Sequence, residues 1–276
     1  MRIAIMQGRL LPPTDGRFQC FPREGWRDEF ALAADAGLDG IEWIYDLHGA
    51  DVNPIAADDG VKSSKALSTQ SGVVVRSLCA DYFMDMPLLR VEPHEIKRRT
   101  ETLDWLLHRC AILGVGRVVL PFVDASRIDS DAELDHVVRL LEGMIPVLEE
   151  TGVELHLETS LSPSRFALLL ARLPHPMLKV NYDSGNSASL GYDPADEFAA
   201  YGGRVGSVHI KDRVHGGGTV PLGRGDTNFG ALFQCLSALG YSGDYVLQVA
   251  RGTDFDEVPW ARKNREYVMA LQAGRA

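Results

Sequence analysis

Short apolar runs alternate along this chain with segments whose apolar residues recur every three or four positions. Eight runs have strand length and are rich in branched side chains: residues 2–7, 40–45, 73–80, 117–123, 153–158, 178–183, 205–210 and 244–249. Segments with helical spacing lie between them or after the last, and include residues 26–37, 95–114, 131–152, 164–173, 229–240 and 257–272. Such alternation predicts parallel strands joined by right-handed helical crossovers.

Eight strand and helix repeats favour closure into a barrel over an open sheet. We therefore predict one domain over residues 1–276, a single (β/α)₈ barrel, since such barrels run to about 250 residues as one unit. A doubly wound α/β fold is the alternative. The turn after the first strand lacks the G-x-G-x-x-G pattern of its nucleotide-binding version, which makes that alternative the weaker one.

Composition narrows the class of protein further. Hydrophobic residues make up 45% of the chain and the formal net charge is −10. No segment approaches the roughly 18 apolar residues of a membrane span, and the first residues are too polar for a secretion signal. The acidic charge argues against nucleic-acid binding. We expect a cytoplasmic protein that acts on a small molecule and does not bind a membrane. Formation of a homo-oligomer is kept as an alternative to a monomer.

Polar side chains gather where the predicted strands end. The active site of a (β/α)₈ barrel is built from the carboxyl ends of its strands and the loops that follow. The polar residues at these positions are Gln7, Arg9, Glu42, Asp81, Asp124, Glu158, Asp183, His209, Lys211 and Gln248. We expect the functional site to be drawn from this set.

Three of these residues have the chemistry of a metal site. Strand side chains alternate between faces, which turns Glu158, Asp183 and His209 toward the barrel interior on consecutive strands. Two carboxylates and an imidazole at one height suit Mn²⁺, Mg²⁺, Co²⁺ or Zn²⁺. Each residue alone would be an ordinary hydrogen-bonded core group, so the prediction of one divalent ion depends on the three together.

The remaining candidates are interpreted as substrate-binding residues. Gln7 and Arg9 would line the floor of the pocket, and Glu42 would contact substrate or form an ion pair at the rim. His156 lies one layer below Glu158, as a partner that orients it or as a buried core histidine. Lys211 and Arg213 would grip a carboxylate or phosphate, or form a solvated rim. The glycine-rich stretch 215–230 would approach a ligand or move as a lid.

Four strand-end motifs strengthen this interpretation by resemblance. The stretches LHLET, NYDSGN, VHIKD and VLQVA resemble the metal site of the xylose-isomerase-like barrel superfamily, and the opening MQGRLLPPTDGRFQCFP resembles its sugar-phosphate isomerase/epimerase branch. The likeness runs from Met1 to about residue 270. It implies Glu158, Asp183, His209 and Gln248 as metal ligands, with Glu158 also moving a proton. Two positions depart from the family: Gln248 replaces the Glu of epimerases, and Asn186 replaces a substrate-contacting His.

The resemblance implies an isomerase of a small sugar or sugar phosphate that works by proton transfer through a metal-bound enediolate. Because Gln248 cannot act as a second base, one-face isomerisation is favoured over 3-epimerisation. A lyase of the inosose-dehydratase type and a non-catalytic sugar-binding protein also fit this set of residues. The endonuclease branch of the superfamily is disfavoured by the acidic charge and by the few histidines at strand ends.

Overall fold

Eight parallel strands close into a barrel in this computed structural model, which describes residues 1–252 and 256–274. The barrel strands are β1 (Arg2–Met6), β2 (Gly40–Ile44), β3 (Val74–Cys79), β4 (Arg117–Phe122), β5 (Glu154–Thr159), β6 (Leu178–Asp183), β7 (Val205–Ile210) and β10 (Asp244–Leu247). Each pairs with the next barrel strand along the chain, and β10 closes on β1, with Arg2 opposite Asp244 and Ile5 opposite Leu247. The predicted (β/α)₈ barrel is confirmed.

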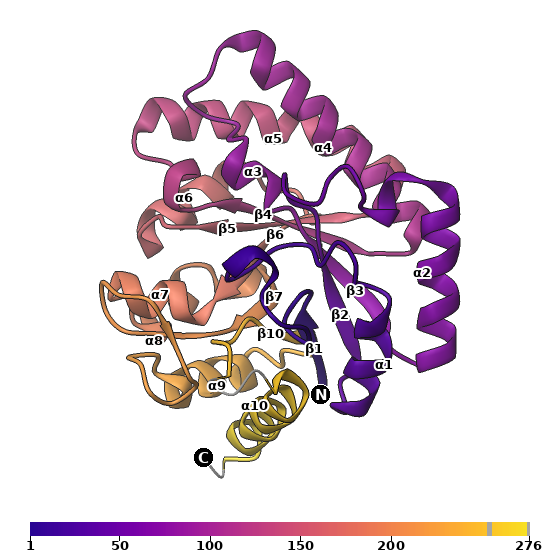
Figure 1. Ribbon diagram of the computed structural model, residues 1–276. Coiled ribbons are helices and arrows are strands. Elements are labelled where there is room, and N and C mark those ends of the chain that lie inside the picture. Colours follow the sequence, from indigo (N-terminus) through magenta and orange to yellow (C-terminus); the bar gives the residue numbers. More distant parts are fainter. Residues whose placement is uncertain (253–255, 275–276) are drawn as a thin grey trace.

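Helices surround the barrel on its outer side (Figure 1). They are α1 (Asp28–Asp35), α2 (Asp58–Ser71), α3 (Tyr82–Asp85), α4 (Pro93–Leu113), α5 (Asp131–Thr151), α6 (Pro163–Arg172), α7 (Ser184–Leu190), α8 (Pro194–Tyr201), α9 (Phe229–Ala238) and α10 (Glu257–Gln272). Helix α5 illustrates the local causes. Ser130 and Glu133 form a capping box at its start, and Gly152 ends it in the left-handed conformation at φ 68°.

The main hydrophobic core lies between the barrel and the helices. On β5, Leu155 and Leu157 are fully buried, and α5 contributes a buried stripe of leucine, valine and methionine side chains. Burial of such apolar side chains is the largest favourable contribution to folding. The alternate residues of β5, Glu154, His156 and Glu158, bond to side chains of β6 and β7 inside the barrel. This is the alternation that the sequence predicts.

The glycine-rich stretch after β7 folds into a short ribbon. Strands β8 (Asp212–Arg213) and β9 (Thr219–Val220) pair antiparallel, and the loop then returns to Asp212. The carboxylate of Asp212 accepts backbone hydrogen bonds from Gly223, Arg224, Gly225 and Thr227 at 2.8–3.1 Å. A side chain at Gly225 would overlap that carboxylate, so the turn requires glycine there. The result is an anchored loop at the carboxyl end of the barrel.

Candidate metal centre and the cavity above it

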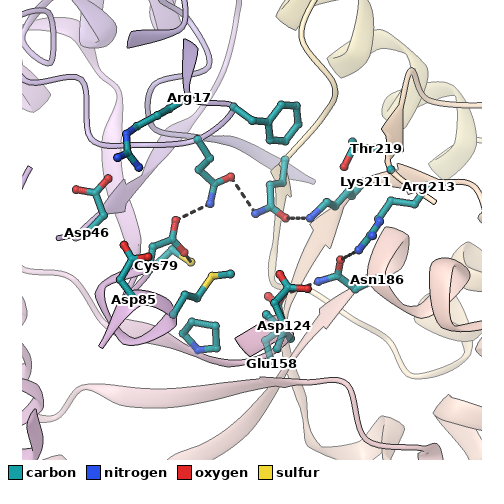
Figure 2. Close-up of a pocket in the computed structure, with 18 of the residues that line it drawn as sticks. Arg17, Asp46, Cys79, Asp85, Asp124, Glu158, Asn186, Lys211, Arg213 and Thr219 are labelled. Carbon is teal, nitrogen blue, oxygen red and sulfur yellow. Dashed lines mark hydrogen bonds between the residues drawn. The ribbon is translucent and has the colours of Figure 1, made fainter. Parts of the chain in front are cut away.

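A cavity of about 380 Å³ opens at the carboxyl ends of the barrel strands (Figure 2). Charged and amide side chains dominate its wall. They include Asp81, Glu158, Asn186, Lys211, Arg213 and Gln248. A polar hollow at this end of a (β/α)₈ barrel is where ligands bind in this fold.

Glu158, Asp183 and His209 meet beside the cavity, and of these three Glu158 is among the residues that line it. Each offers one ligand atom, and these atoms all lie within 4.8 Å of one another, with the three residues buried. The register of the sheet produces this meeting, because Asp183 on β6 stands opposite His209 on β7. The Oδ1 atom of Asp183 accepts from the backbone of Gly185 and Asn186 and caps α7. The cluster could hold a metal ion.

The orientation of His209 fits this use. Its Nε2 atom lies 2.6 Å from Oε1 of Glu42, whose other oxygen accepts from the hydroxyl of Ser77. Its Nδ1 atom is buried, lies 3.4 Å from Oε2 of Glu158, and makes no hydrogen bond within the described part of the chain. A carboxylate on one imidazole nitrogen and a free second nitrogen is the usual arrangement of a metal-binding histidine.

The negative charges of the carboxylates around His209 also favour a cation there. Burial lowers the pKa of His209, but the carboxylates of Glu42 and Glu158 outweigh burial and raise the pKa to about 10. The two carboxylates therefore favour a positive charge at this position. A divalent ion would supply that charge between the two carboxylates.

The carboxylate of Glu158 is held by two amides. Asn181 donates to Oε2 and Asn186 donates to Oε1, each at 2.8 Å. Asn181 in turn accepts from the hydroxyl of Ser207, which lies 2.7 Å from Nδ1 of His156. These hydrogen bonds fix the direction of both carboxylate oxygens of Glu158.

Four residues predicted to bind substrate lie behind the cavity wall. Gln7, Arg9, Glu42 and His156 are buried and are absent from the described residues that line the cavity. Gln7 accepts from the backbone of Ile44, and the other three bond to side chains next to the site. Any effect of these four residues on a ligand in the cavity would pass through a neighbouring side chain. Asn186, Lys211 and Arg213 do line the cavity.

A chain of side chains crosses the opposite wall of the cavity. Lys211 Nζ donates to Oε1 of Gln248 at 3.1 Å, Gln248 Nε2 donates to Oε1 of Gln19 at 3.0 Å, and Gln19 Nε2 donates to Oδ2 of Asp81 at 2.6 Å (Figure 2). Sequence patterns do not reveal Gln19, because it lies in a loop far from any strand end. Asp81 belongs to the strand-end set, although no role is predicted for it there.

Arg213 holds the rim on the side of the β8–β9 ribbon. It donates through Nη1 to Oδ1 of Asn186 at 2.8 Å and through Nε and Nη2 to the carbonyl of Gly217. Through Asn186 it is connected to Glu158. The ribbon after β7 is therefore connected to the candidate metal centre by one arginine and one amide.

No helix in residues 1–252 and 256–274 is long and apolar enough to cross a membrane.

Comparisons with known proteins agree with the strand-end motifs. The L-ribulose-5-phosphate 3-epimerase UlaE of Escherichia coli is 25% identical over 266 residues, which cover 91% of each chain. The crystal structure of D-psicose 3-epimerase with D-tagatose from Clostridium cellulolyticum matches with a TM-score of 0.76 at 15% identity, over 99% of both chains. The structure of the IOLI protein with a bound zinc atom matches with a TM-score of 0.79 at 14% identity, over 100% of this chain and 99% of the other.

A family match covers most of the chain. The sequence profile described as xylose isomerase-like TIM barrel matches residues 30–271, a span that contains Glu158, Asp183, His209 and Gln248. The resemblance seen in the strand-end motifs is thereby confirmed. The chain belongs to the xylose isomerase-like TIM barrel family.

Proposed function

We propose that this protein is a divalent-metal-dependent isomerase or epimerase of a small sugar or sugar phosphate. The observation that carries the proposal is the buried meeting of Glu158, Asp183 and His209 beside a polar cavity at the carboxyl end of the barrel. Relatives that are sugar 3-epimerases support an enzyme that acts on sugars.

The proposed metal ligands are Glu158, Asp183 and His209, with Oε1 of Gln248 as a further oxygen donor. The amide nitrogen of Gln248 donates to Gln19, and its oxygen accepts from Lys211, whose Nζ atom also lies 3.4 Å from Oδ2 of Asp183. Carboxylate, imidazole and amide donors suit Mn²⁺, Mg²⁺, Co²⁺ or Zn²⁺. When bound, one such ion would polarise the carbonyl of a ketose and make the adjacent C–H bond more acidic.

Glu158 is the proposed base. Its carboxylate lines the cavity and is held in place by hydrogen bonds from the amides of Asn181 and Asn186. It would take the proton next to the carbonyl, the C–H electron pair would form the carbon–carbon double bond of an enediolate, and the carbonyl oxygen would receive the displaced pair. Return of a proton to a neighbouring carbon gives isomerisation, and return to the same carbon from the other side gives epimerisation.

Lys211 and Arg213 favour a substrate with oxygens or an anionic group near the rim. Both line the cavity, Lys211 within 3.4 Å of Oδ2 of Asp183. Because Arg213 already donates to Asn186 and Gly217, its main proposed role is to hold Asn186 in place. Lys211 is the cation proposed to contact substrate oxygens.

The test is proton exchange at the carbon next to the carbonyl. Chelated protein reloaded with Mn²⁺ is incubated in deuterium oxide with D-allulose, D-tagatose, L-ribulose or L-ribulose 5-phosphate, and NMR follows loss of the proton and new sugar signals. We expect Mn²⁺-dependent exchange with at least one sugar and a loss of about 100-fold in Glu158→Gln.

The matched control is Glu142→Gln, which removes an exposed carboxylate from α5 and should leave exchange unchanged. Exchange that persists without metal, or full exchange in Glu158→Gln, would contradict the proposal. Binding of sugar without any exchange would instead identify a sugar-binding protein, and loss of water from the product would identify a lyase.

A further inference from the structure

We propose that Asp81 is the second proton-transfer group of this site and serves the face of the substrate that Glu158 does not reach. The inference rests on the proposed function and gives it a stereochemical outcome. It addresses the departure at Gln248, an amide that can neither take nor give a proton at neutral pH. A site with two proton-transfer groups can epimerise, whereas a site with Glu158 alone returns the proton to the side it left.

Asp81 stands across the cavity from the candidate metal centre. It lies two residues after the end of β3, and in the closed order of eight strands β3 is two positions from β5, which carries Glu158, and four from β7, which carries His209. Both Asp81 and Glu158 line the same cavity, Glu158 from β5 and Asp81 from the start of α3. A small sugar held at the metal centre would therefore lie between the two carboxyl groups.

The direction of the Asp81 carboxyl is fixed by a chain of donors. Arg9 and Gln248 both donate to Oε1 of Gln19, at 2.9 and 3.0 Å. The amide nitrogen of Gln19 must then face the other way, where it donates to Oδ2 of Asp81 at 2.6 Å. The thiol of Cys79 lies 3.1 Å from Oδ1 of Asp81. A group held at both oxygens is ready for proton transfer without reorganisation.

The same chain explains why residue 248 is an amide. Oε1 of Gln19 accepts from Arg9, so its partner at residue 248 must be a donor, and a glutamate there would place two acceptor oxygens together. Gln248 thus gives up a proton-transfer role and connects Asp81, through Gln19, to Lys211. Residue 248, which follows β10, has no carboxyl group, and Asp81, which follows β3, supplies one at the same cavity.

The environment of Asp81 suits both protonation states. Burial raises the pKa of Asp81 to about 6, the nearby charge of Glu158 acts in the same direction, and the hydrogen bonds from Gln19 and Cys79 oppose the shift. A group with a pKa close to the working pH is efficient as acid and as base. The position of Asp81 at the cavity is set by the fold and by its contacts with Gln19 and Cys79.

The proton and electron movements balance over one turnover. Glu158 takes the proton from one face of the carbon next to the carbonyl, and the C–H pair forms the enediolate double bond. Protonated Asp81 then gives its proton to the other face, the double-bond pair forms the new C–H bond, and the carbonyl reforms. Glu158 loses its proton to solvent and Asp81 takes one up, which restores the starting state.

The two carboxyl groups therefore serve different epimers as bases. Mn²⁺-loaded Asp81→Asn is compared with wild type in deuterium oxide on two pairs of carbon-3 epimers: D-allulose with D-fructose, and L-ribulose 5-phosphate with its epimer. We expect Asp81→Asn to lower interconversion about 100-fold in both directions. Exchange should persist from the epimer whose proton Glu158 takes and should be lost from the other. Glu158→Gln should show the opposite pattern.

Asp196→Asn is the matched control, because Asp196 is an exposed carboxylate on α8 and is not among the described residues that line the cavity. Mn²⁺ affinity and melting temperature of Asp81→Asn should match wild type, since asparagine keeps the acceptor for Gln19. Wild-type epimerisation by Asp81→Asn overturns the inference, and so does equal loss of exchange from both epimers. Wild-type protein with no exchange on any sugar would refute the proposed function itself, and the inference with it.

Discussion

At the scale of single residues, the candidate site depends on which atom of each side chain is left free. Glu42 occupies Nε2 of His209 and leaves Nδ1 toward Glu158. Asp183 uses Oδ1 to cap α7 and keeps Oδ2 beside Lys211. These pairings turn three ordinary polar residues into a cluster whose free atoms converge, which is the physical basis for assigning metal binding to them.

Glu42→Gln tests the role of the carboxylate behind His209. The amide keeps a hydrogen-bond acceptor but loses the negative charge, so the imidazole becomes a weaker donor of its lone pair to a metal. We expect Mn²⁺ affinity to fall roughly 10-fold, as is typical of such partners. Calorimetric titration of the chelated variant measures this. An unchanged affinity, with an unchanged fold by circular dichroism, would mean that Glu42 does not act on the metal.

At the scale of elements, the loop after β7 connects the sheet to the cavity rim. The buried carboxylate of Asp212 collects four backbone N–H groups and so holds the turn 223–227 against β8. The neighbouring residue Arg213 reaches back to Asn186, which donates to Glu158. The position of this loop and the orientation of the proposed base are therefore linked.

Asp212→Ala should release this loop while the barrel stays folded. The substitution leaves four backbone donors without their acceptor, and we expect a local cost of about 2 kcal/mol. Hydrogen–deuterium exchange of the amides of Gly223, Arg224, Gly225 and Thr227 should accelerate about 30-fold, with helix α5 unaffected. Unchanged protection of these amides would show that other contacts hold the turn.

The elements that the sequence predicts best are those buried on a continuous face. Apolar strand runs place all eight barrel strands within about two residues of their observed ends, because the strands are covered by helices outside and packed inside. Helix α2 is not predicted by the spacing of apolar residues, because only Val61 and Ser64 of its 14 residues are buried. The two-residue strands of the β8–β9 ribbon are too short to leave a periodic signal.

The candidate site was predictable in part for a similar reason. Alternation along β5, β6 and β7 is enough to bring Glu158, Asp183 and His209 to one height in a barrel. The Gln19 contact to Gln248 joins residues 229 positions apart, through a loop whose path no periodicity describes. Alternation gives the face of a strand on which a side chain lies but not the depth of the cavity, and Gln7, Arg9, Glu42 and His156 are not among the described residues that line it.

At the scale of the whole molecule, a titratable group buried near the first strand makes the free energy of unfolding depend on pH. Glu29 on α1 is fully buried, and its Oε1 accepts from the backbone of Gly8 at 2.6 Å. Burial raises the pKa of Glu29 from 4.5 to about 8, although hydrogen bonds from Gly8 and Leu10 oppose the shift. The folded state therefore binds this proton more tightly than the unfolded chain does.

The contribution of Glu29 to the free energy of unfolding should fall as the pH rises. The contribution of Glu29 to stability is fully present below pH 4.5 and is lost as the pH rises through about 8. Glu29→Gln carries no such proton, so its unfolding free energy should fall less than that of wild type between pH 5 and pH 8. Urea unfolding at both pH values measures the difference. Equal falls in the two proteins would show that Glu29 is ionised in the folded state.

Glu158, Asp183 and His209 are proposed to form one divalent metal site, and calorimetric titration of chelated protein with Mn²⁺ measures binding at this site. Asp183→Asn keeps the oxygen that caps α7 but removes the charge, and Asp193→Asn is its matched control, since Asp193 caps α8 in the same way. We expect one ion per chain in wild type and in Asp193→Asn, and a Mn²⁺ affinity at least about 10-fold lower in Asp183→Asn. No binding in wild type, or equal affinity in all three proteins, would contradict the proposed metal site.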